Sequence, residues 1–170
     1  MTGLMQGKRG LIMGLANDKS LAWWIAQKLT EHGAEIALSY QGEVMEKRVR
    51  PLAEQLGCDF MIDCDVSTEA ELDKTFATLA ARWPTIDFVV HAIAFADKAE
   101  LDGRYVDTTE GNFTKSLLIS CYSFTALAQR AEKLMTNGGS LLTLSYYGAE
   151  KVMPHYNVMG VAKATLDASV

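Results

Sequence analysis

The sequence predicts an α/β fold built on a doubly wound parallel sheet. Short apolar runs alternate with segments of helical periodicity along the chain. The runs are apolar on both sides, which is typical of parallel strands that helices cover on both faces. A length of 170 residues with 49% hydrophobic residues suits one domain with a sizeable core. We therefore expect a single domain over residues 1–170.

The predicted elements follow one another in strand–helix units. Apolar runs mark five strands, at residues 8–14, 35–41, 59–66, 86–94 and 140–145. Helical patterns lie at residues 20–33, 43–57, 67–83, 109–135 and from Pro154 onward. The first three units form a βαβαβ half of a Rossmann-type domain, the kind that binds dinucleotides.

Individual residues set the predicted ends of the first helices. Ser20 is the expected N-cap of the first helix and Gly33 its C-cap. Pro51 should kink the second helix or begin a new one. Thr68 and Glu71 form a capping-box pattern at the start of the third helix.

The later part of the chain has two proline boundaries and an open end. Pro84 should stop the third helix, and Pro154 suits the first turn of the last one. The fifth strand would be an uncovered edge unless further chain pairs with it, and the sequence stops within a helical pattern. We expect the domain to be incomplete at its C-terminus, with later strands absent from this chain.

Composition excludes several classes of function. A net charge of −5 argues against nucleic-acid partners and anionic membrane surfaces. No apolar run has the length of a membrane span, and the start lacks the apolar core of a signal peptide, so we expect a cytoplasmic protein. The three cysteines, Cys58, Cys64 and Cys121, lack C-x-x-C spacing and are expected to be buried free thiols rather than zinc ligands.

Three strand ends carry candidate nucleotide-binding residues. In the first strand–helix turn, Gly14 allows a tight turn and Ser20 could donate to a phosphate at the helix N-terminus, although G-x-G-x-x-G is absent and a plain helix cap explains the turn as well. Gln41 is either an uncharged partner for a ribose or a turn residue. Asp65 either accepts from an adenine amino group or caps the next helix. His91, alone on an apolar strand, is expected to be a core residue.

Two tyrosines and a lysine follow the fifth strand. On a helix, Tyr156 and Lys163 would share nearly one face, about 10 Å apart along the axis. Both could reach one extended ligand, with Gly160 leaving room between them, and Tyr146 lies just upstream. The alternative is an amphipathic helix with a lysine at its edge.

Taken together, these segments resemble the short-chain dehydrogenase/reductase superfamily, and within it the divergent branch of bacterial enoyl-acyl carrier protein reductases. The most specific block, "LLTLSYYGAEKVMPHYNVMGVAKA", carries the Y-x6-K pair of that branch, where other members have Y-x3-K. The turn at Gly14, Ser20, Leu21 and Ala22 has its G-x5-S-[IL]-A pattern. One departure is Ala94, where many relatives have glycine.

The resemblance implies a role for each matching residue. For NAD binding these are Gly14, Ser20 and Leu21 at the pyrophosphate, Gln41 at the adenosine ribose, Asp65 and Val66 at the adenine, Ile93 near the nicotinamide and Lys163 at its ribose. Tyr156 would donate to the reacting thioester, Tyr146 matches a second active-site tyrosine, and Ala96 would border the substrate.

The implied function is NADH-dependent reduction of the carbon–carbon double bond of trans-2-enoyl-acyl carrier protein, an oxidoreductase step of bacterial fatty-acid elongation, by a full-length homotetramer. Uncharged Gln41 fits NADH rather than NADPH. One alternative is a carbonyl or alcohol short-chain dehydrogenase, which requires a lysine where this chain has Gly160. Another is a nucleotide-binding module without catalysis.

Overall fold

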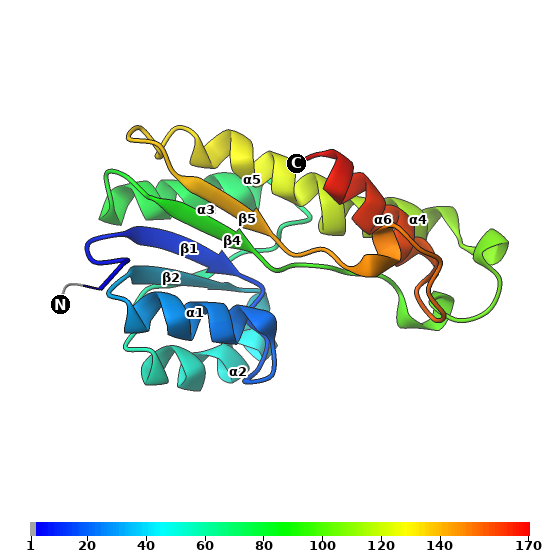
Figure 1. Ribbon diagram of the computed structural model, residues 1–170, viewed down its shortest axis with the longest axis horizontal. Helices are drawn as coiled ribbons and strands as arrows, with labels where there is room; N and C mark the ends of the chain where they lie inside the picture. The colour runs from blue at the N-terminus through cyan, green and yellow to red at the C-terminus, as the bar shows by residue number, and fades with distance from the viewer. Residues whose placement is uncertain (1–2) are drawn as a thin grey trace. The chain divides into compact units, whose positions relative to one another are not determined.

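The computed structural model describes residues 3–170, which group into two compact units (Figure 1). The first, here called the sheet unit, comprises the chain up to Ala92 together with Ala128–Thr143. The second, here called the helical unit, comprises Ile93–Leu127 and Leu144–Val170.

The sheet unit contains a five-stranded parallel sheet, which confirms the predicted fold class. Its strands are β1 (Arg9–Met13), β2 (Glu35–Tyr40), β3 (Met61–Asp63), β4 (Phe88–His91) and β5 (Ser140–Thr143). They lie in the order β3-β2-β1-β4-β5, so the strand order reverses between β1 and β4. Ligands of doubly wound folds bind at the carboxyl ends of the strands at such a reversal.

Helices cover both faces of this sheet. On one face, α1 (Leu21–Glu31) and α2 (Gly42–Gln55) share a buried core with Ile12 of β1 and Leu38 of β2 (Figure 1). On the other lies α3 (Glu69–Arg82), whose Leu72, Phe76 and Leu79 are buried. The alternation of strand side chains between these two cores produces the runs that are apolar throughout.

The ends of α1 and α2 differ in detail from the prediction. Ser20 holds the N-cap position, but its hydroxyl donates to the Asn17 carbonyl at 2.6 Å and makes no capping bond. The C-cap is His32, and Gly33 follows it in the left-handed region at φ 95°. The helix α2 runs through Pro51 without interruption, so no new helix begins there.

The capping box predicted for α3 does not form. Thr68 is the N-cap by position only, because its side chain makes no capping bond. Asp65 instead shapes this turn by accepting from the Ser67 N–H at 2.9 Å, and Glu71 pairs with Lys74 at 3.4 Å. The helix ends at Arg82, before Pro84, as predicted.

The long helical pattern at 109–135 is divided into three segments. These are α4 (Glu110–Leu117), a π-helical segment (Leu118–Tyr122) and α5 (Ser123–Ala131), whose last residues belong to the sheet unit. In the helical unit, α6 (Asn157–Ala168) packs against α4.

The start of α6 corrects a further prediction. Pro154 does not lie in its first turn, because His155 adopts φ 58° and this left-handed residue delays the helix until Asn157. Tyr156 is consequently the N-cap rather than a residue of the helix.

The cysteines and the apolar character of the helices were also the subject of predictions. All three cysteines are buried free thiols, as predicted. Across residues 3–170, the structure contains no helix that combines the length and the apolar character of a membrane span.

Candidate functional site

The turn between β1 and α1 passes unusually close to the end of β4. Gly14 has φ 94°, and a Cβ at this position would lie 2.0 Å from the carbonyl oxygen of Ala92. Only glycine satisfies both the left-handed backbone and this approach. The geometry of the turn therefore requires glycine at position 14, even though the usual glycine-rich pattern is absent.

The N-terminus of α1, which follows this turn, suits an anion. No side chain caps the helix and its first turn carries no acidic residue. The Ser20 hydroxyl and the Lys19 N–H bond to Asn17, which closes the preceding loop on itself. Leu21 is exposed at the first helical position. The Trp23 N–H donates to the Ser20 carbonyl at 3.0 Å. The N–H groups of Leu21 and Ala22, together with the helix dipole, are therefore available to a phosphate.

The ends of β2 and β3 hold the other candidates of the sheet unit. Gln41 is exposed at the N-cap of α2, where Asp63 accepts from the Gly42 N–H at 2.8 Å. Asp65 is partly buried and shapes the turn into α3, so its local structural role is observed. Val66 beside it is buried.

His91 is fully buried, and its Nδ1 lies 2.9 Å from the hydroxyl oxygen of Thr143 on the neighbouring strand β5. The prediction that it is a core residue is confirmed.

In the helical unit, the segment after β4 is fixed by a serine that the sequence analysis missed. Ser120 accepts from the Phe95 N–H at 2.9 Å and donates to the Phe95 carbonyl at 3.1 Å. It is buried in the π-helical segment, a type of irregularity that is frequent at functional sites. The partly buried candidates Ile93 and Ala96 flank Phe95. In the sequence, the role of Ser120 is indicated only by the presence of a serine within a long helical pattern.

The rings of Tyr146 and Tyr156 contact each other. Their ring centroids are 4.9 Å apart, with an interplanar angle of 66°. The Tyr156 ring also packs on Gly148, where a Cβ would lie 2.5 Å from its Cδ1 atom. Burial, with a smaller effect of Tyr146, raises the pKa of Tyr156. Its hydroxyl therefore stays protonated to a higher pH than that of an exposed tyrosine, and among residues 3–170 it has no hydrogen-bond partner.

Lys163 is buried, which rules out the alternative of a lysine at the edge of an amphipathic helix. Its side chain lies inward from α6, and its Nζ donates to the Leu144 carbonyl at 2.6 Å. Burial lowers the pKa of Lys163, and Asp167 opposes that shift. Further Nζ protons remain for a ligand, because an ammonium group has three.

Gly160 lines the cavity beside Tyr156 and has a packing role in addition to the predicted one. A Cβ there would lie 2.9 Å from the carbonyl oxygen of Gly148. The absence of a side chain therefore allows α6 to approach the short helix Tyr147–Ala149, rather than only making room for a ligand.

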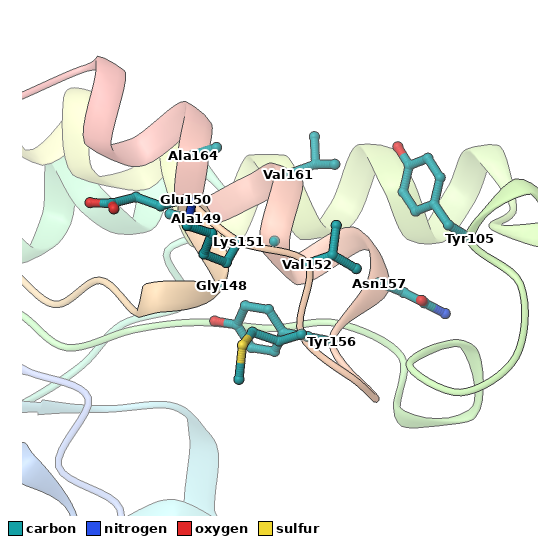
Figure 2. Close-up of a pocket in the computed structure, with 12 residues that line it drawn as sticks. Tyr105, Gly148, Ala149, Glu150, Lys151, Val152, Tyr156, Asn157, Val161 and Ala164 are labelled. Carbon is teal, nitrogen blue, oxygen red and sulfur yellow. The ribbon is translucent and has the colours of Figure 1, made fainter.

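A cavity of about 440 Å³ opens beside Tyr156. Figure 2 shows the Tyr156 ring below the 148–152 segment, with Tyr105 and Val161 elsewhere around the cavity. The helical unit thus places the Tyr156 ring beside a partly apolar hollow, which is the usual character of a small-molecule site.

These features define a class of protein: a doubly wound fold with a tyrosine at the start of its last helix and a buried lysine within that helix, as in short-chain dehydrogenases/reductases. The family model described as enoyl-(acyl carrier protein) reductase matches residues 14–170. The chain belongs to this family.

Individual relatives agree with this assignment. The chain is 62% identical to enoyl-[acyl-carrier-protein] reductase [NADH] 1 of Rhizobium meliloti, over 99% of this chain and 62% of that protein. It is 58% identical to the reductase FabI of Rickettsia bellii, over 99% of this chain and 64% of that protein. The solved reductase of Anaplasma phagocytophilum, in complex with NAD, matches with TM-score 0.97 and 62% identity, over 100% of this chain and 65% of that one. The chain thus spans less than two thirds of each relative.

Proposed function

We propose that the protein containing this chain reduces the carbon–carbon double bond of trans-2-enoyl thioesters on acyl carrier protein, with NADH as the hydride donor. The observation that carries this proposal is the placement of Tyr156, whose ring packs on Tyr146 and Gly148 seven positions before the buried Lys163. The names of the relatives, which are NADH-dependent enoyl-acyl carrier protein reductases, support the same reaction.

The sheet unit supplies residues that fit the nucleotide part of NADH. The tight turn at Gly14 and the uncapped N-terminus of α1, with Ser20 and Leu21, suit a pyrophosphate. Gln41 would bond the adenosine ribose and, being uncharged, gives no attraction to the 2′-phosphate of NADPH. Asp65 and Val66 would lie by the adenine.

The helical unit supplies residues for the reaction itself. Bound NADH provides a hydride for the β-carbon of the enoyl thioester, so that negative charge develops on the thioester oxygen. The Tyr156 O–H would donate to that oxygen. A preorganised donor of this kind lowers the barrier because it stabilises the negative charge that develops in the transition state. The α-carbon then takes a proton to complete the saturated product.

The remaining residues would orient the reactants. Lys163 would hydrogen-bond the nicotinamide ribose, and its positive charge favours the anionic transition state. Ile93 would pack near the nicotinamide, Ala96 would border the acyl chain and Tyr146 would support the Tyr156 ring. We also propose that the protein is cytoplasmic and assembles as a homotetramer, as the family resemblance implies.

The test is NADH consumption by the protein as its gene encodes it. Crotonyl and longer trans-2-enoyl thioesters are expected to be reduced, whereas simple ketones should give no turnover. Robust activity on a ketone or alcohol, without reduction of the enoyl thioester, would contradict the proposal and favour a carbonyl dehydrogenase.

The pH dependence of the reaction should follow Lys163 rather than Tyr156. Burial lowers the pKa of Lys163 from its ordinary value of 10.5, so its charge is lost at a lower pH than that of an exposed lysine. Burial raises the pKa of Tyr156 above 10.0, so the phenol remains a donor beyond that pH. The alkaline fall of kcat/KM is therefore expected below pH 10.5.

A Lys163→Arg variant tests this assignment, because arginine stays charged throughout the accessible range. Its alkaline fall in kcat/KM should move to higher pH, where Tyr156 titrates. An alkaline limb at the same pH in both proteins would contradict the assignment to Lys163.

A further inference from the structure

Tyr156 lies between two residues with unusual backbone conformations. His155 has φ 58° and Asn157 has φ 32°, and among residues 3–170 no other residue except glycine has a positive φ. Histidine and asparagine adopt the left-handed region more readily than most residues, yet such conformations persist only where the surroundings hold them. The tyrosine of the proposed site is therefore carried on a turn that needs support.

Both flanking side chains bond to the same neighbouring segment. The Asn157 Nδ2 donates to the carbonyl oxygens of Glu100 at 3.0 Å and Asp102 at 3.3 Å. The imidazole Nδ1 of His155 contacts the carboxylate of Asp102. Residues 100–102, here called the anchor segment, are thus held from both sides of Tyr156.

The anchor segment is in turn attached to the start of α4. The Glu100 carboxylate accepts from the Thr109 N–H at 2.9 Å, from the Thr109 hydroxyl at 2.8 Å and from the Asn112 amide at 3.1 Å. The bonds from Thr109, and less so that from Asn112, lower the pKa of Glu100. Asn112 is itself buried and accepts from Ser116 at 3.1 Å.

We propose that Asn157, assisted by His155, is a positioning residue that fixes the direction of Tyr156 through the anchor segment. The Tyr156 backbone lies at the N-cap of α6, so the intrahelical hydrogen bonds do not by themselves set its conformation. Gly148 and Tyr146 hold the ring, and Asn157 holds the backbone from which the ring projects.

Asn157 is not a group that would touch the reacting atoms. Its amide already donates to two carbonyl oxygens. Figure 2 shows its side chain directed away from the Tyr156 hydroxyl. Its effect on the reaction must therefore act through Tyr156. The expected effect of Asn157 on turnover rests on the proposed function. Its role in holding Tyr156 in place can be tested without turnover.

The decisive variant is Asn157→Gly in the protein as its gene encodes it. Glycine keeps the left-handed backbone available and removes both hydrogen bonds to the anchor segment. We expect kcat for enoyl thioester reduction to fall by about 10- to 100-fold, because a misplacement of order 1 Å can cost that much. KM for NADH should change by less than about two-fold, because Asn157 would not contact the nucleotide.

One further variant separates the contribution of His155 from that of Asn157, and another serves as a control. Asp102→Ala removes the partner of His155 but keeps the carbonyl oxygens that Asn157 uses, so its effect should be several-fold smaller. Asn137→Gly, an equivalent change at an exposed asparagine of the sheet unit, should leave kcat unchanged.

A readout independent of turnover is the titration of Tyr156, followed by NMR with labelled tyrosine. In Asn157→Gly the Tyr156 pKa should move down toward its ordinary value, because a loosened ring is more exposed to water. An unchanged titration together with an unchanged kcat overturns the inference. A fall in kcat that only matches a loss of folded protein overturns it as well. If the wild type reduces no enoyl thioester, the titration still decides the structural part.

Discussion

Replacing Tyr156 with phenylalanine is expected to lower kcat for enoyl thioester reduction by about 10²- to 10³-fold, the usual effect of removing one preorganised donor from a developing oxyanion. The ring and its contacts with Tyr146 and Gly148 are kept, so only the hydroxyl is lost. Affinity for NADH should stay within about two-fold, because the hydroxyl acts on the charge that forms in the transition state.

Steady-state kinetics with an enoyl thioester, and calorimetry with NADH, measure the two quantities separately. The matched control is Tyr147→Phe, which removes a hydroxyl from an exposed tyrosine of the same segment and should leave kcat unchanged. Unaltered turnover in Tyr156→Phe, or an equal loss in the control, would show that the phenol is not the donor.

The second large effect is expected from Gly14→Ala. The methyl group would lie 2.0 Å from the Ala92 carbonyl oxygen, which is backbone and cannot move without distorting the end of β4. The φ of 94° adds strain for any residue with a Cβ. We expect a loss of roughly 3 kcal/mol or more in the free energy of unfolding, which is the range of backbone clashes and overpacking.

Gly57→Ala is the control for this variant. Gly57 also has a positive φ, of 66°, but no atom lies within 4 Å of the Cβ that would be added. It should cost only about 1 kcal/mol, the conformational part of the effect. Urea unfolding of both variants gives the comparison. Equal losses would mean that the approach of the β1–α1 turn to β4 does not require glycine.

Much of the fold could be predicted from periodicity, because the strands of a parallel sheet that is covered on both faces appear in the sequence as short apolar runs. The helix ends were less predictable. Ser20 and Thr68 are common capping residues, but Asn17 and Asp65 organise the turns in front of them and leave those side chains without a capping role. Local competition of this kind among short polar side chains cannot be resolved from residue types alone.

The candidate site was likewise predictable in part. Tyr156 and Lys163 could be singled out because their spacing matches a family, and the structure adds that the lysine is buried. The left-handed turn on both sides of Tyr156 was not predicted, since Pro154 suggested an ordinary helix start. The hydrogen bonds of Asn157 join positions that are 57 and 55 residues apart, beyond the reach of any local pattern.

The most direct test of the central claim is the position to which hydride is delivered. With NADH deuterated at the transferred position, reduction of crotonyl thioester should give a butyryl thioester with one deuterium on the β-carbon, as seen by NMR and mass spectrometry. Deuterium on the former carbonyl carbon of an aldehyde or alcohol product, with the double bond intact, would contradict the account.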